Sequence, residues 1–205
     1  PIHGSRSVKV SPADTLASPH GWHDTNGIAG GEFTTTRGNN VFAYTDDDAD
    51  DAPDFVPNGG TNLNFNFSLN IAQQPSGYQN VAVTNLFYTC NRIHDIFYRY
   101  GFDEANGNFQ ENNYGNGGLG NDYVLAEAQD GGGTNNANFG TPDDGQNGRM
   151  QMYVWTVSGS SNLLTVNSPT VIAGQYVSAE STFGPGLTLA PITANVVLVN
   201  DGSGD

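Results

Sequence analysis

The sequence is poor in three features that define large classes of protein. Its 205 residues include a single cysteine, Cys90, which excludes any disulfide within the chain. Only six Lys and Arg stand against 21 Asp and Glu, and the net charge of -15 excludes binding to nucleic acid phosphates or to an anionic membrane surface. No apolar run approaches the ~20 residues that cross a bilayer, so we expect no membrane insertion.

An export signal is also missing, because the chain begins at Pro1 without a basic start, an apolar stretch or a cleavage site. This start is explained equally well by a signal that was removed by processing and by one that was left out of the sequence. Charged residues make up only 13% of the chain, whereas glycine reaches 27 residues. A surface made polar by amides, hydroxyls and glycine is common in secreted proteins, so we expect an extracellular location.

The length allows one well-packed core, or one domain plus the start of a second. The first 40 residues carry short β-prone pieces, at Ser7–Val10 and Glu32–Thr36, which predict short strands. Residues Asn62–Leu69 alternate strictly between apolar and polar side chains, which predicts a half-buried strand.

The longest regular pattern covers about residues 80–100 and predicts an amphipathic helix, because apolar side chains recur at three- and four-residue spacing. Gly101 supplies the left-handed residue that ends the helix, and Phe102 is placed to pack back on Phe97 as in a Schellman closure. Cys90 belongs to the apolar stripe and is expected in the core as a small buried hydrophobe. The stripe consists of Val83, Leu86, Phe87, Cys90, Ile93, Phe97 and Tyr100.

Short strands are expected after the helix. Gly131-Gly132-Gly133 and Pro142–Gly145 are turn signals between them. From Ser158 the chain consists of short Val-, Thr- and Leu-rich pieces and ends with a predicted strand at Asn195–Val199, after which we expect the natural polypeptide to continue. One long helix followed by several short strands places the chain in the α+β class. The strands expected between the helix and Ser158 are Asp122–Gln129, Asn135–Phe139 and Arg149–Trp155.

The histidines do not form a zinc site in this reading. His20 and His23 have a spacing that suits chelation on one helical turn, but the flanking proline and glycine disfavour a helix there. His94 lies on the predicted helix and is expected to be packed or at the surface. With no third ligand and no glutamate base, the sequence offers no catalytic zinc centre.

An acidic run, Asp46-Asp47-Asp48-Ala49-Asp50-Asp51, places five carboxylates in one short loop. Like charges at this density favour a cation, and oxygen ligands favour calcium. The run is not an EF-hand, because its sixth position is Asp51 instead of glycine and its twelfth is Pro57 instead of glutamate. Two readings stay open for this run: a solvated acidic loop, and a calcium site formed by Asp46, Asp48 and Asp50. The loops near residues 103–113 and 143–145 are further candidates of the same kind.

Motifs for nucleophilic catalysis and nucleotide binding are absent from the sequence. No Gly-x-Ser-x-Gly elbow occurs, and Cys90 lies inside the predicted helix. The glycine-rich stretch Gly115–Gly120 neither follows a buried strand nor opens a helix, so it is read as a loop.

Seven blocks of the sequence carry a resemblance to a known family. They are Gly4–Val8, Thr35–Val41, Asn85–Phe102, Gly118–Asp122, Ala126–Asp130, Asn135–Phe139 and Arg149–Trp155. In the same order, these blocks are similar to parts of the catalytic domain of the fungalysin family of secreted zinc metallopeptidases. The resemblance implies a thermolysin-like domain with zinc in the cleft between a β-rich N-terminal lobe and a helical C-terminal lobe. It places the His-Glu-x-x-His zinc helix and the general base in the C-terminal lobe, and no position of this chain matches them.

The same resemblance implies a role for Asn136 and Ala137. In thermolysin-like enzymes an edge strand of the N-terminal lobe holds the extended peptide substrate by backbone hydrogen bonds, often with an Asn-Ala pair on it. Strand addition to an exposed edge reads the main chain rather than the side chains, which suits a protease of broad specificity. An ordinary exposed strand is the alternative for this pair.

Residues 158–205 do not match the continuation that the family implies. Ala173–Asp205 instead resembles the opening of a protease-associated domain, which some bacterial fungalysin-like proteins carry as an insertion between the two lobes. We therefore predict an N-terminal lobe at residues 1–157 and the start of a β-rich inserted domain at residues 158–205.

Two functions are open at this point. The first is the substrate-binding N-terminal lobe of a secreted zinc metalloendopeptidase, which is inert without the lobe that carries zinc. Its expected partners are peptide or protein substrates, its own C-terminal lobe and an inhibitory propeptide. The alternative is a non-catalytic, secreted, β-rich binding module that is stabilised by calcium.

Overall fold

The computed structural model describes residues 7–156, 163–166 and 174–177 of the chain. Two compact units are present, residues 1–156 and residues 157–205, and each is described by itself. One long helix and a mixed four-stranded sheet confirm the α+β class. The elements of the first unit are β1 (Val41–Thr45), η1 (Pro75–Tyr78), α1 (Gln79–Tyr98), η2 (Glu104–Asn106), β2 (Val124–Thr134), β3 (Ala137–Gly140) and β4 (Arg149–Val154).

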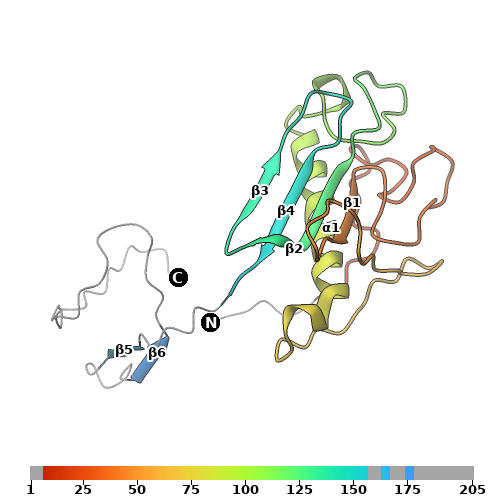
Figure 1. Cartoon of the computed structure of the whole chain (residues 1–205). Helices are drawn as coiled ribbons and strands as arrows, with labels where there is room; N and C mark the ends of the chain where they lie inside the picture. The colour runs from red at the N-terminus through yellow and green to blue at the C-terminus, as the bar shows by residue number, and fades with distance from the viewer. Residues whose placement is uncertain (1–6, 157–162, 167–173, 178–205) are drawn as a thin grey trace, which may run out of the picture. The chain divides into compact units, whose positions relative to one another are not determined.

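The sheet of the first unit has the strand order β1-β2-β4-β3 (Figure 1). β1, β2 and β4 are parallel, whereas β3 runs antiparallel to β4 and forms one edge of the sheet. The register pairs Tyr44 with Glu127 between β1 and β2, and Glu127 with Gln151 between β2 and β4. These three side chains therefore lie on the same face of the sheet, because side chains at paired positions share a face.

Helix α1 covers the opposite face and packs mainly against β1 and β2. Cys90 is buried in this core, as predicted. The helix ends as predicted: Gly101 has a φ of +95°, its N–H donates to the Tyr98 carbonyl, and the Phe102 N–H donates to the Phe97 carbonyl. The Phe102 ring lies edge-on to the ring of Phe109. The buried apolar core consists of Trp22, Val41, Ala43, Val83, Phe87, Cys90, Val124, Ala126 and Ala128.

The predicted apolar stripe of α1 is wrong beyond Cys90. Ile93, Phe97 and Tyr100 are exposed, and the side of the helix that is buried carries Asn91 and Asp95 instead. The reason is a polar network, in which the Asp95 carboxylate accepts hydrogen bonds from the Asp14 N–H, the Ser18 hydroxyl and the Trp22 indole. The N-terminal segment thus binds the helix through hydrogen bonds to Asp95 as well as through the packing of Trp22 on Phe87 and Tyr88.

The strand predicted at Asn62–Leu69 is not present. Leu63 has a φ of +50°, and the backbone bonds locally, with the Asn64 N–H donating to the Gly59 carbonyl. Leu63, Phe65 and Phe67 are half-buried in alternation with exposed residues, but Leu69, the fourth apolar residue of the pattern, is 48% exposed, and no strand among the described residues pairs with this segment. The alternation therefore belongs to an extended loop that packs one side on the domain.

Three further local predictions differ from the structure. Gly131-Gly132-Gly133 is not a turn, because β2 continues through it to Thr134, with register shifts between Ala128 and Asp130 and, at the glycines, between Asp130 and Thr134. Ser7–Val10 forms no strand, and the Glu32–Thr36 region contributes only the isolated bridge between Thr35 and Asn58. β1 was not anticipated, since five residues between a polar loop and an acidic run carry little periodic signal.

The second unit contains β5 (Leu163–Val166) and β6 (Gly174–Val177), which pair in antiparallel fashion. The predicted strand Asn195–Val199 lies outside the described residues, and the identity of 158–205 as the start of a protease-associated domain stays a prediction. Among the residues that the structure describes, no helix has the length and apolar character needed to cross a membrane.

Candidate functional site

Strand β3 is the open edge of the sheet. All four of its residues are exposed, Ala137 is its first residue, and Asn136 immediately precedes it. At the other edge, β1 is covered on its outer side by bridges from Arg37 to Phe42 and from Thr45 to Phe55. Within the described residues, only β4 pairs with β3. The two residues singled out in the sequence therefore lie at the sheet edge that can accept another strand.

The register of β3 decides which backbone groups point outward. The Tyr153 N–H donates to the Asn136 carbonyl at 3.3 Å, just outside the pair of Ala137 and Met152. In an antiparallel ladder this makes Ala137–Met152 a non-hydrogen-bonded pair, and the alternation makes Phe139 the next such residue on β3. The N–H and C=O groups of Ala137 and Phe139 thus point away from β4.

One of these outward groups already has a partner. The Asn136 side-chain carbonyl accepts a hydrogen bond of 2.8 Å from the Ala137 N–H. The Ala137 C=O and both backbone groups of Phe139 are then the positions with which an added extended chain can pair. The Asn136 amide nitrogen lies beside them as a further donor.

Side chains hold β3 in place from both faces. On one face the Asn138 amide donates to the Gln151 side chain at 3.0 Å and to the Tyr153 hydroxyl at 2.8 Å. On the other face the Phe139 ring lies edge-on to Phe109, with the ring centroids 5.8 Å apart. The edge strand is therefore fixed to the sheet by its side chains, while its outer backbone groups stay accessible.

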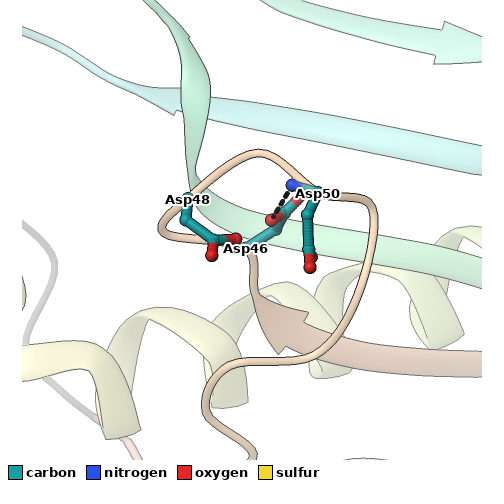
Figure 2. A group of neighbouring side chains, drawn as sticks. All are labelled: Asp46, Asp48 and Asp50. Carbon is teal, nitrogen blue, oxygen red and sulfur yellow. Dashed lines mark hydrogen bonds between the residues drawn. The ribbon is translucent and has the colours of Figure 1, made fainter.

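The acidic loop that follows β1 brings three carboxylates together (Figure 2). Oxygen atoms of Asp46, Asp48 and Asp50 lie within 4.8 Å of one another. Asp46 is fully buried and accepts hydrogen bonds of 3.0 Å from the Asp50 and Asp51 N–H groups, whereas Asp48 and Asp50 are exposed. The neighbouring charges of Asp50 and Asp54 raise the pKa of Asp48. The loop thus concentrates negative charge at the protein surface.

Gly131 allows β2 to approach this loop closely. Its N–H donates to the Asp46 carbonyl at 2.7 Å, and a Cβ at this position would lie 2.2 Å from the Asp47 carbonyl oxygen. No side chain fits at that distance, so the sequence needs glycine where the acidic loop rests on the strand.

A second group of carboxylates lies beneath the loop and was not predicted. Asp46, Glu127 and Asp130 also converge within 4.8 Å, and each is at most 1% exposed. Glu127 accepts hydrogen bonds from the Tyr44 hydroxyl and from the Arg149 guanidinium, both at 3.0 Å. Burial raises the pKa of Glu127, although Arg149 opposes the shift. The Arg149 guanidinium therefore pairs with one of the three buried carboxylates, Glu127, and also with the exposed Asp51 of the acidic loop.

Sequence reasoning missed this group because Asp46 is more than 80 residues away from Glu127 and Asp130 in the sequence. Only the pairing of β1 with β2 brings Asp46 to Glu127 and Asp130. The one available signal was the presence of Glu127 and Asp130 in a strand-like run, because a buried charged side chain needs a hydrogen-bonding or ionic partner. Asp130 finds its partners in the Gly132 N–H, at 2.6 Å, and the Gln151 amide, at 2.7 Å.

Among the described histidines, His94 and His23 are held by packing and hydrogen bonds, as expected for His94. Its ring bonds Asp95 at 3.1 Å and Gln110 at 3.0 Å, and its side chain is 7% exposed. Burial raises the pKa of Asp95, but the hydrogen bonds that it accepts outweigh this effect and hold the pKa below its usual value. His23 stacks on Phe65 with ring centroids 5.5 Å apart, and burial lowers its pKa to about 4.

The convergent ligand groups of the described part of the chain contain carboxylates only, with no histidine among them. The loops near residues 103–113 and 143–145 do approach each other, since a Cβ at Gly107 would lie 3.7 Å from the Asp144 side chain. The second loop is further held by bonds from the Leu119 N–H to the Asp144 carboxylate and from the Gly145 N–H to Asp122. No three carboxylate, histidine or cysteine ligands converge at that place among the described residues.

Comparison with known proteins adds a family match. The sequence model described as fungalysin metallopeptidase (M36) matches residues 1–184. The chain is 47% identical over 169 residues to extracellular metalloproteinase mep of Aspergillus flavus, which covers 77% of this chain and 25% of that protein. It is 42% identical over 177 residues to extracellular metalloproteinase 5 of Trichophyton tonsurans, covering 84% and 28%. For extracellular metalloproteinase 1 of Arthroderma otae the identity is 43% over 176 residues, covering 84% and 27%. The chain spans about a quarter of the length of these relatives.

Proposed function

Because this chain belongs to the fungalysin metallopeptidase family, we propose that it forms the N-terminal, substrate-binding lobe of an extracellular zinc metalloendopeptidase. The observation that carries the proposal is the open edge of β3, where Ala137 and Phe139 direct backbone groups outward beside Asn136. An extended peptide that adds to this edge gains main-chain hydrogen bonds whatever its side chains are. The substrates are therefore peptides or proteins in an extended conformation.

Zinc belongs to the other lobe in this proposal. The carboxylate-only ligand groups of the described residues do not fit a catalytic zinc, which requires nitrogen donors and an open position. Zinc bound in the other lobe would supply Lewis-acid polarisation of the scissile carbonyl and an activated water. The residues of this chain hold and orient the peptide, and by themselves they do not cleave it. Besides substrates, the partners of the lobe are its own C-terminal lobe and an inhibitory propeptide.

A chimeric enzyme tests the peptide-binding role. The part of this chain that aligns with the Aspergillus flavus metalloproteinase, 77% of its length, replaces the matched segment of that protein, and hydrolysis of a synthetic peptide is measured. Asn136→Ala should lower kcat/KM about tenfold, the value of one lost hydrogen bond. Asn138→Ala is the matched control, because its side chain bonds Gln151 and Tyr153 on a sheet face, and it should change kcat/KM less than about twofold.

The substrate backbone gives an independent readout. Substrates that are N-methylated at one residue at a time should lose binding at alternate residues, since only every second residue of an added strand faces the partner strand. Equal losses at all positions, or equal effects of the two asparagine substitutions, would mean that β3 does not hold the peptide.

The loop of Asp46, Asp48 and Asp50 supports a second proposal, a calcium site that stabilises the lobe. Such a site would equally stabilise the chain if its function were that of a non-catalytic binding module. Calcium at ten times its dissociation constant should raise the free energy of unfolding by about 1.4 kcal/mol. Asp48→Asn/Asp50→Asn should abolish this increase, whereas magnesium should not replace calcium in a loop of this flexible kind. An unchanged melting temperature with calcium identifies the loop as a solvated acidic surface.

A further inference from the structure

Strand β3 is short for a strand that has to hold a peptide. It has four residues, all of them exposed, and among the described residues it pairs only with β4. Because Ala137 and Phe139 direct their backbone groups outward, the ladder bonds to β4 come from Asn138 and Gly140. A strand held by so few bonds frays, and molecules in which it has frayed do not bind a peptide. Side chains that keep β3 on the sheet therefore also control peptide binding.

Phe109 supports β3 from a loop outside the sheet. Its ring lies edge-on to the Phe139 ring, with the centroids 5.8 Å apart and an angle of 66° between the ring planes. On its other side the same ring lies edge-on to Phe102, beyond the end of α1, with the centroids 5.9 Å apart. Phe109 is half-buried and packs against the apolar core. Because edge-to-face aromatic pairs are more favourable than burial of the same area alone, Phe109 joins β3 to the core through Phe139.

Gly148 is the point at which the rings of Phe109 and Phe139 meet the main chain. A Cβ at this position would lie 3.0 Å from the Phe109 ring and 3.1 Å from the Phe139 ring. Gly148 is buried directly before β4, and its carbonyl accepts a hydrogen bond of 2.8 Å from the Leu125 N–H on β2. Since the main chain is fixed here, a methyl group can enter only by displacing the two rings. The missing side chain of Gly148 thus lets Phe109 and Phe139 pack closely.

A buried polar network fixes the main chain on both sides of Phe109. Its neighbours Asn108 and Gln110 are 0% and 1% exposed, and the Asn108 amide donates to the Gln110 side-chain carbonyl at 2.7 Å. The Gln110 N–H donates to the Asp122 carboxylate at 2.8 Å, and the His94 ring on α1 bonds the Gln110 side chain at 3.0 Å. Phe109 therefore cannot follow β3 if the strand moves, and its ring is a fixed support.

We propose that Phe109 is a positioning residue for the peptide. It holds Phe139, and with it β3, where the outward backbone groups of Ala137 and Phe139 bond an extended chain. The inference rests on the proposed function, because Phe109 has a role in binding only if β3 holds the peptide. A residue that only filled the core would stabilise the whole domain without changing the order of β3, and this difference is measurable.

Amide hydrogen exchange of the 205-residue chain, measured residue by residue by NMR, tests the positioning directly. The inward N–H of Asn138 reports fraying of β3, and the N–H of the fully buried Ala126 on β2 reports unfolding of the domain. Phe109→Leu keeps an apolar side chain but loses the edge-on ring contact. It should speed exchange at Asn138 about tenfold.

Phe42→Leu is the matched control. Phe42 is also half-buried and has an aromatic partner, Tyr44, but it lies on β1 at the opposite edge of the sheet. Its substitution should change exchange at Asn138 less than about twofold. Unchanged exchange at Asn138 in Phe109→Leu would overturn the proposal. So would exchange at Asn138 as slow as at Ala126 in the unsubstituted chain, because β3 would then not move separately from the domain.

Gly148→Ala tests the same contact from the other side. By forcing the two rings apart it should speed exchange at Asn138 at least about threefold. Adding Phe109→Leu makes room for the methyl group, so the double variant should exchange at Asn138 no faster than Phe109→Leu alone. Effects that multiply would show that Gly148 and Phe109 act independently, which would overturn the role given to their contact.

The chimeric enzyme connects the order of β3 to catalysis. Phe109→Leu should raise KM for the synthetic peptide about threefold and change kcat less than about twofold, because a less ordered β3 weakens binding and leaves the catalytic lobe unchanged. A fall in kcat at constant KM would overturn the proposal.

The two proposals fail in different ways. Faster exchange at Asn138 in Phe109→Leu, together with unchanged hydrolysis by Asn136→Ala, would mean that Phe109 orders β3 but that β3 holds no peptide, which overturns the proposed function. Unchanged exchange at Asn138, together with a tenfold loss of kcat/KM in Asn136→Ala, would overturn the role of Phe109 alone.

Discussion

At the centre of the four-stranded sheet both faces are buried, but they are built from opposite chemistry. Ala126 and Glu127 are neighbours on β2, and both are fully buried. Ala126 faces α1 within an apolar core, whereas Glu127 faces Tyr44 and Arg149 within a group of carboxylates. The apolar face is held by contacts that have no direction, and the polar face is held by hydrogen bonds that each need one geometry.

The two faces should therefore respond differently to changes in solution conditions. The apolar face should resist changes in pH and ionic conditions, because none of its core residues carries charge. The polar face and the N-terminal segment contain buried ionisable groups, whose free energies depend on protonation. Substitutions and pH changes can therefore break one face while leaving the other intact.

The largest effect is expected on the apolar face. Phe87→Ala should lower the free energy of unfolding by about 4 kcal/mol, because it removes a buried ring that contacts Trp22 and His23. Phe97→Ala, on the exposed side of the same helix, should cost less than about 1 kcal/mol. Urea denaturation of both variants measures the contrast, and similar losses would mean that the burial pattern of α1 is wrong.

A somewhat smaller effect is expected on the polar face. Glu127→Ala should cost about 3 kcal/mol, since it leaves the Tyr44 hydroxyl and the Arg149 guanidinium without their buried acceptor. Glu127→Gln keeps an acceptor oxygen and should cost less. The same denaturation experiment compares the two, and a neutral Glu127→Ala would show that repulsion from Asp46 and Asp130 cancels the value of these bonds.

The pH dependence should be smaller still and should come from His23. Its folded pKa of about 4 lies below the usual 6.5, so the unfolded chain binds a proton between these values while the folded chain does not. Stability is fully present above pH 6.5 and falls as the pH falls. Between pH 7 and pH 5 the loss should be about 2 kcal/mol, measured by denaturation at each pH. His23→Gln should flatten this change, and a variant that keeps the full pH dependence would assign it to other groups.

Local features were predictable from the sequence. The helix follows from apolar spacing, and Gly101 ends it in the predicted left-handed conformation. β3 and β4 each begin and end within two residues of the predicted segments, because alternating side chains and turn residues are close in sequence. The position of Asn136 and Ala137 at the sheet edge was expected only from family resemblance, since nothing local marks a strand as an edge.

Features that depend on distant partners were not predictable in the same way. Ile93 was predicted to be buried but is exposed, and Asp95 is buried instead. The reason is that Asp95 accepts hydrogen bonds from Asp14, Ser18 and Trp22, which lie more than 70 residues earlier in the chain. The convergence of Asp46 with Glu127 likewise depends on strand pairing across 80 residues. Apolar periodicity predicts which side chains of an element are buried. Whether a charged side chain can also be buried depends on hydrogen-bond partners that only the tertiary structure supplies.

The hydrogen bond from the Ala137 N–H to the Asn136 side chain has a consequence for aggregation. An open edge strand is a template on which other chains can extend a sheet without limit. β3 offers only four residues, and its first outward donor is already occupied within the chain. Such an edge is long enough to capture one short segment but too short and too incomplete to seed a growing fibre.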